Sequence, residues 1–97
     1  MNIVFEWDAI KARKNLRKHN VSFEEARTIF FDPMLITFPD EAHSGSEERF
    51  ISIGLSARTR LLLVVHTEQH ESENEIVIRL ISSRRATTTE RKFHEEG

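Results

Sequence analysis

Cysteine is absent from this chain of 97 residues, and glycine and proline are rare, with three and two residues. Without cysteine the protein has no disulfide, no thiolate nucleophile and no cysteine-ligated zinc, which fits a reducing cytoplasm. The glycines form neither a glycine-rich phosphate loop nor a Gly-x-Ser-x-Gly nucleophile elbow. No apolar run approaches the roughly 20 residues of a membrane helix, and the N-terminus lacks the features of a signal peptide. We therefore expect a cytoplasmic protein with no membrane partner.

The histidines do not have the spacing of a metal site. They contain no His-x-x-x-His pair on a helix, because the only close pair, His66 and His70, spans a strand end and a polar turn. We therefore expect no metal and no cofactor. The five histidines are His19, His43, His66, His70 and His94.

The length and the ordinary content of hydrophobic residues, 38%, predict one globular domain over residues 1–97. A first strand is expected over residues 2–6, and a first helix runs from the N-cap Asp8 to about His19, closed by Asn20. Ser22 and Glu25 have capping-box spacing and open a second helix. Residues 32–33, Asp-Pro, end it.

The rest of the chain has the pattern of strands, over residues 34–38, 48–55, 61–67 and 75–82. Short turns at 56–60 and 69–74 favour an antiparallel meander. The predicted fold class is α+β, with two N-terminal helices packed on a four-stranded antiparallel sheet and a short, polar C-terminal helix. Strand 34–38 is expected at an edge of the sheet, where it could support a homodimer.

Basic residues gather in two segments although the net charge is -2. Residues 11–18 hold five lysines and arginines and no acid, and a second group follows Arg79. Arg84 and Arg85 precede a predicted helix start, where Thr87 and Glu90 have capping-box spacing. Free N–H groups and the helix dipole favour an anion there, so we predict phosphate binding by Arg84 and Arg85. Arg79 has two interpretations, a phosphate ligand or a strand residue paired with Glu48 or Glu68.

Further candidates come from positions where polar side chains meet a loop or a helix end. His43 lies in a polar loop and could act as a general base, with Glu48 orienting it or an arginine, and Arg49 stands beside them. Lys18 and His19 end the first helix, whose dipole favours a protonated imidazole; they could supply an acid or hold phosphate, or simply cap the helix.

The remaining candidates are more easily explained by packing. Trp7 could stack on a base or belong to the core. Arg60 is expected to be exposed to solvent, and His66 is expected to be a packed or cross-strand residue of the sheet.

Three segments together resemble the BrnT family, the toxins of bacterial BrnT/BrnA type II toxin-antitoxin modules. The first is Phe5-Glu-Trp-Asp with Asn15-Leu-Arg-Lys-His-Asn-Val-Ser-Phe-Glu-Glu-Ala. The second is Asp40-Glu-Ala-His-Ser-Gly-Ser-Glu-Glu-Arg-Phe with Gly54-Leu-Ser, and the third is Arg79-Leu-Ile-Ser-Ser-Arg-Arg-Ala-Thr with Glu90-Arg-Lys. They span nearly the whole chain. Family members usually have glycine at Asn20 and a tyrosine near His94, so any role of that tyrosine in RNA binding is missing here.

The resemblance implies a RelE-like fold and metal-independent RNA cleavage that blocks translation. It also implies neutralisation by a BrnA-type antitoxin with a ribbon-helix-helix domain, so that operator DNA is contacted only through the antitoxin. The hypothesis is therefore an endoribonuclease toxin with RNA as substrate. The expected catalytic and phosphate-binding residues are Lys18, His19, His43, Glu48, Arg79 and Arg84, with Arg85, Arg49 and Trp7 binding RNA. The alternative is a module of the same fold that binds nucleic acid or antitoxin without catalysis.

Overall fold

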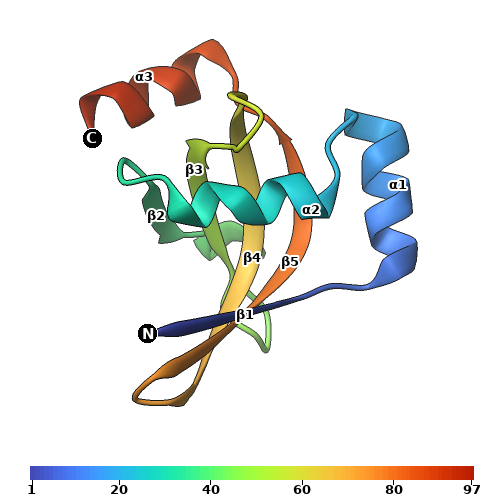
Figure 1. Ribbon diagram of the computed structural model, residues 1–97, viewed down its shortest axis with the longest axis vertical. Coiled ribbons are helices and arrows are strands. Elements are labelled where there is room, and N and C mark those ends of the chain that lie inside the picture. The colour runs from blue at the N-terminus through green and yellow to red at the C-terminus, as the bar shows by residue number, and fades with distance from the viewer.

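The computed structural model describes residues 1–97 and has a five-stranded sheet in the order β1-β5-β4-β3-β2 (Figure 1). Its strands are β1 (Asn2–Glu6), β2 (Ile36–Pro39), β3 (Phe50–Leu55), β4 (Leu61–Ser72) and β5 (Glu75–Arg85). The helices are α1 (Ala9–His19), α2 (Phe23–Ala26), which continues as the 3-10 helix η1 (Arg27–Phe31), the 3-10 helix η2 (Glu41–His43) and α3 (Thr88–Glu96). No helix is long and apolar enough to span a membrane.

The predicted α+β class is confirmed, but the four-stranded antiparallel sheet is wrong. β1 adds a fifth strand, parallel to β5, with Asn2 aligned to Glu75 and Glu6 to Arg79. The other three pairings are antiparallel. The fifth strand forms because alternate residues of β1, Ile3 and Phe5, pack against the core cluster and would otherwise be exposed. β2 lies at the opposite edge of the sheet, the position that was expected for the strand over residues 34–38.

The hairpin between β4 and β5 is longer than predicted. Residues expected in a turn continue the ladder, with Gln69 aligned to Val77 and Ser72 to Glu75, because the two strands keep their pairing to the tip. β2 begins later than expected, since the Met34 N–H donates to Asp32 Oδ1 at 2.8 Å and keeps that segment in a turn. β5 also runs beyond the predicted end at residue 82, to Arg85.

The second helical segment has the predicted ends, Ser22 and Asp32, but it becomes a 3-10 helix after Ala26 and its capping box is incomplete. Ser22 is the N-cap, as its Oγ accepts the Glu25 N–H at 3.0 Å. The Glu25 carboxylate does not return to the N-cap, because it accepts Ser56 Oγ–H at 2.7 Å and Arg60 Nε–H at 2.9 Å. Arg60 is therefore not a solvent residue: a second N–H group binds the Asn20 carbonyl at 3.0 Å and ties the β3–β4 turn to the end of α1.

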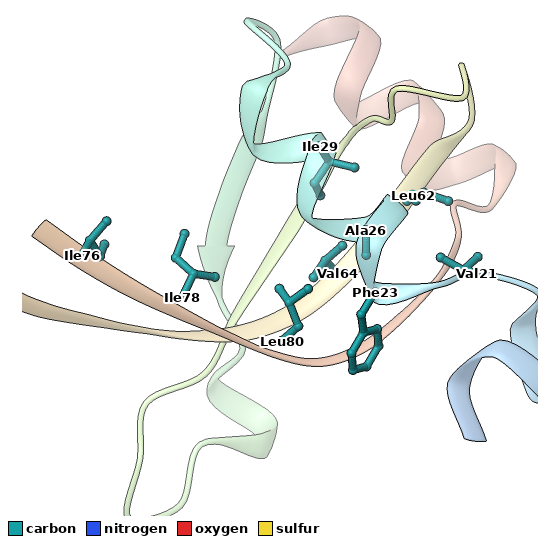
Figure 2. Close-up of a cluster of buried hydrophobic side chains, with 9 residues drawn as sticks. All are labelled: Val21, Phe23, Ala26, Ile29, Leu62, Val64, Ile76, Ile78 and Leu80. Atoms are coloured by element: carbon teal, nitrogen blue, oxygen red, sulfur yellow. The ribbon is translucent and has the colours of Figure 1, made fainter. Parts of the chain in front are cut away.

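The main core lies between the α2–η1 segment and one face of the sheet. Figure 2 shows side chains of α2 and η1 directed at those of β4 and β5. Apolar residues at alternate positions of β5 supply the sheet side of this core. The cluster contains Val21, Phe23, Ala26, Ile29, Leu62, Val64, Ile76, Ile78 and Leu80.

Asn15 attaches α1 to the outer edge of β5, the edge that faces away from β4. Because β1 pairs only as far as Arg79, the outer edge of β5 is open beyond that residue. The Asn15 amide closes it: Oδ1 accepts the Ser83 N–H at 3.0 Å, and Nδ2 donates to the Ser83 carbonyl at 2.9 Å. Nδ2 also donates to the Val21 carbonyl at 2.9 Å. Asn15 is only 7% exposed. Its side-chain amide makes the two hydrogen bonds that the backbone of a neighbouring strand would otherwise make with Ser83.

We expect Asn15→Ala to lower the free energy of unfolding by about 3 kcal/mol, because it leaves a buried N–H group and two carbonyls without partners. Lys14→Ala, an exposed change on the same helix, should stay within about 0.5 kcal/mol of wild type. Urea unfolding followed by circular dichroism measures both. Equal stability of the two variants would show that the amide contacts add nothing.

Candidate functional site

A cavity of about 580 Å³ lies on the sheet face opposite α2. Strand residues that point away from the main core give it apolar walls, among them Ile51, Ile53, Leu63 and Val65. Polar and aromatic side chains from four other parts of the chain complete it. They are His19 from α1, Phe38, Asp40, His43 and Arg49 around η2, Arg84 from β5, and Glu90 and Phe93 from α3.

A β-bulge shapes the β5 side of this cavity. Val65 is aligned with Ser82 and His66 with Leu80, so Ile81 is an extra residue in the ladder. Both Ile81 and Ser82 line the cavity as a result. The bulge also shifts the alternation beyond it, which places Arg84 opposite Leu63 on the cavity side.

The cavity brings together His19, His43, Arg49 and Arg84 of the residues predicted from the sequence. These four come from α1, η2, the residue before β3 and the end of β5, so only the fold brings them to one cavity. Asp40, which the sequence presented only as part of the loop, joins them.

His43 is oriented by Asp40. Its Nδ1 lies 3.2 Å from both carboxylate oxygens of Asp40, three residues earlier in the 3-10 turn. A carboxylate only accepts, so Nδ1 carries a proton in this contact, and in the neutral ring Nε2 is the acceptor. The Asp40 side chain is 11% exposed, whereas that of His43 is 72% exposed. The imidazole therefore has one fixed nitrogen and one available nitrogen.

The loop that carries this pair is fastened by Ser44. Its hydroxyl donates to the Asp40 carbonyl at 2.9 Å and accepts the Arg49 N–H at 3.0 Å. The Asp40 N–H in turn donates to the Arg49 carbonyl at 2.8 Å. Arg49 and the Asp40–His43 pair are thus held in a fixed relation.

Arg84 is paired with Glu90 rather than free. Two parallel bonds of 2.8 Å join the guanidinium to the carboxylate, and Arg84 Nη1 also donates to the Arg85 carbonyl at 3.1 Å. Hydrogen bonding to Arg84 lowers the pKa of Glu90 below its usual value. Glu90 also accepts the Thr87 N–H at 2.8 Å and completes the predicted capping box. The anion at this helix start is therefore a side chain of the protein itself.

Arg85, Lys18 and Glu48 are exposed and do not line the cavity. Arg85 is aligned with the core residue Leu62 and so points to the other face of the sheet from Arg84, which separates the predicted pair. Glu48 acts on the pKa of Glu68, which burial raises, and the carboxylate beside His43 is that of Asp40.

Trp7 and Arg79 also lie outside the cavity. The Trp7 ring packs edge-on against Phe23, with centroids 6.0 Å apart, and lines a small groove between α1 and α2. Arg79 is exposed, aligned with Glu6 and Thr67, and shares a second small hollow with Trp7 and Asp8. The expected pairing of Arg79 with Glu48 or Glu68 is absent.

The last helix, α3, closes one end of the cavity and is held mainly by polar contacts. None of its residues is buried. His94 Nε2 lies 2.8 Å from Asp32 Oδ2, with both side chains largely covered, and Glu90 binds Arg84 at the other end. Phe93 lies between these two contacts in the sequence, lines the cavity and is 59% exposed. Phe38 of β2 also lines the cavity and is 41% exposed.

His66 is a packed residue, as predicted. It is fully buried, and its Nε2 lies 2.7 Å from Ser52 Oγ, which in turn lies 2.7 Å from Thr37 Oγ1. Burial lowers its pKa to about 4, so the ring is neutral at pH 7. No three His, Asp or Glu side chains lie together as metal ligands would.

We expect Glu90→Gln to raise the affinity for inorganic phosphate by about threefold to tenfold, because it releases Arg84 from a charged partner. The pairing requires ionised Glu90, whose pKa is lowered. The gain should therefore shrink as pH falls through that lowered pKa, where wild-type Glu90 itself becomes neutral.

Isothermal titration calorimetry provides the measurement. Glu95→Gln removes the same charge from an exposed position of α3 and serves as the control. No gain for Glu90→Gln relative to this control would mean that Arg84 only holds α3 in place.

Comparison with known proteins identifies the family. The family model for the ribonuclease toxin BrnT of type II toxin-antitoxin systems matches residues 7–90. The crystal structure of the Brucella abortus ribonuclease toxin BrnT superposes with a TM-score of 0.63 at 19% identity and covers 91% of this chain and 100% of that one. No curated protein sequence matches. Because the family model spans most of the sequence, the chain belongs to the BrnT family of ribonuclease toxins of type II toxin-antitoxin systems.

Proposed function

We propose that the protein is a metal-independent endoribonuclease of the cytoplasm whose active site is the cavity lined by His19, His43, Arg49 and Arg84. The observation that supports this most is the Asp40–His43 pair, because it leaves one imidazole nitrogen available in a cavity that two arginines also line. Acid-base groups and cations in one cavity are the components that RNA cleavage without a metal requires.

In this proposal His43 is the general base. Nε2 takes the proton of the ribose 2′-hydroxyl, and the 2′-oxygen attacks the adjacent phosphorus. Asp40 is a positioning residue, because its carboxylate holds the Nδ1 proton and stabilises the imidazolium that forms. The exposure of the His43 side chain leaves its free nitrogen accessible to a substrate.

The arginines and His19 serve the other half of the reaction. Arg49 and Arg84 would bind the phosphate oxygens as negative charge grows, and His19 would protonate the departing 5′-oxygen. The products are a 2′,3′-cyclic phosphate and a free 5′-hydroxyl. Arg84 keeps N–H groups for this role while bound to Glu90, because its contacts use only part of the guanidinium.

We expect the purified protein to cleave RNA in the presence of EDTA, and His43→Ala to reduce the rate by about 10²–10⁴-fold, the range for loss of a general base. His70→Ala, at an exposed position of the β4–β5 hairpin, is the matched control and should cleave as wild type does. Gel analysis of a labelled RNA gives the rates. Full activity of His43→Ala, or loss of activity with EDTA, would contradict this mechanism.

The alternative, a module that binds RNA or antitoxin without catalysis, is favoured by one observation: the best-placed arginine is already paired with Glu90. The same assay separates the two functions, because a binding module would retain RNA affinity and show no cleavage.

Family membership implies an RNA target and an antitoxin partner. We propose that this partner is a BrnA-type antitoxin with a ribbon-helix-helix domain, that it covers the cavity and that it alone contacts operator DNA. The exposed phenylalanines at the cavity fit such a partner in the neutralised state. In the free toxin, Phe38 and Phe93 offer faces on which a nucleobase can stack.

We expect Phe93→Ala to weaken RNA binding by about tenfold, within the range for loss of one base–aromatic stack, and Phe93→Trp to restore it. Phe31 is a matched control, since it is 64% exposed but lies in η1, away from the cavity. Fluorescence quenching of 2-aminopurine in a non-cleavable RNA measures the stacking. If Phe31→Ala weakens binding as much as Phe93→Ala, base stacking at the cavity is refuted.

A further inference from the structure

α1 carries a concentration of positive charge that the cavity does not use. All five of its lysines and arginines are exposed, and the helix contains no acid. None of the five forms an ion pair with a carboxylate. In a protein with a net charge of -2, this helix is a local positive surface.

The rotation of α1 about its axis is fixed by Asn15, which points at the edge of β5. At 100° per residue, Ala9, Ala12 and Leu16 turn toward α2, where they line the groove with Trp7. Lys11, Lys14 and Lys18, at spacing i, i+3 and i+7, then form a stripe on the other side of Asn15. By the same rotation, Arg13 and Arg17 lie about 160° and 200° from Asn15 and so face the solvent opposite it, with Arg13 also lining the groove.

The lysine stripe is therefore turned toward the open face of the sheet, the face that carries the cavity. Arg79 lies on that face, because its neighbours Ile78 and Leu80 point into the core on the other. The position of Lys11 agrees with this: Lys11 and Arg79 both act on the Asp8 carboxyl, whose pKa is lowered mainly by hydrogen bonds from the Lys11 and Ile10 N–H groups. His19, the last residue of α1 and the neighbour of Lys18, lines the cavity itself.

We propose that Arg79, Lys11, Lys14 and Lys18 form a track that binds the phosphates of an RNA strand leading into the cavity. The substrate would thus be a segment several nucleotides long that runs along α1. This inference rests on the proposed function and adds a binding surface to it. It also gives a role to Arg79 and Lys18, which do not line the cavity.

The chemistry of the track fits a backbone contact rather than a sequence-specific one. The lysines are spaced by about 4.5 and 6 Å along the helix axis, at a rise of 1.5 Å per residue. An ammonium group on a flexible stem can follow phosphates of varied position and reads no base. Sequence preference, in this arrangement, is left to the cavity.

The test compares two double variants with the same loss of charge on one helix. Lys11→Gln with Lys14→Gln removes part of the stripe, and Arg13→Gln with Arg17→Gln removes the cations on the solvent-facing side of α1. The ligand is a 2′-O-methyl RNA, which cannot be cleaved, long enough to span α1 and the cavity. Fluorescence anisotropy over a range of salt concentrations gives the dissociation constant and its salt dependence.

We expect the lysine variant to bind about tenfold more weakly and to reduce the slope of log K against log salt by about 1.4, for two lost phosphate contacts on a single strand. The arginine variant should lose less than half as much on both measures. Equal losses for the two variants would show non-specific attraction to the helix, and no loss for either would show no contact. Both results would overturn the track.

The RNA cleavage assay keeps this outcome separate from that of the proposed function. If the wild type cleaves RNA and the lysine variant binds the 2′-O-methyl RNA as tightly as wild type, the function stands and the track is wrong. If binding depends on Lys11 and Lys14 but no RNA is cleaved, the track stands and the enzyme proposal is wrong. Absence of any RNA binding by the wild type would reject both.

Discussion

The placement of Asn15 against Ser83 is the constraint on which the functional side of the molecule depends. The side-chain amide presents the same donor and acceptor as a peptide group, so it can pair with a strand edge where no strand is available. This contact sets the position of α1 along β5 and its rotation. His19 at the cavity and the lysine stripe on the helix both follow from that one orientation, and Ser83 stands directly beside Arg84.

Local features of the fold could be predicted from the sequence because their causes are local. Asp8, Ser22 and Thr87 are N-caps, and Asn20 has the left-handed conformation, φ 57°, that ends α1. The errors involve partners distant in sequence. Nothing near β1 indicates that its neighbour is β5, and Glu25 has the spacing of a capping residue but binds Arg60, a stronger, charge-assisted contact.

In the candidate site, too, the sequence predicts individual residues but not their partners in the fold. Residue chemistry selected His19, His43, Arg49 and Arg84, and the fold places them around one cavity. Asp40 was overlooked as the partner of His43 because the 3-10 turn that joins them was read as an irregular loop. Arg85 was grouped with Arg84 because the predicted strand ended too early for alternation to separate them. Nothing in the sequence marks Phe38 and Phe93 as site residues, because only their exposure at the cavity distinguishes them from the other phenylalanines.

The parallel pairing of β1 with β5 has a consequence for biosynthesis. The first strand to leave the ribosome must wait for the last one, because its hydrogen-bonding partner is not yet made. The cavity has the same dependence, because His19 is synthesised well before Arg84 and Phe93. Contacts between segments that are distant in sequence form slowly, and they contribute no stabilising free energy until both segments are present. A nascent chain that lacks α3 therefore carries no assembled site, and nuclease activity, as proposed, would begin only after α3 has been synthesised.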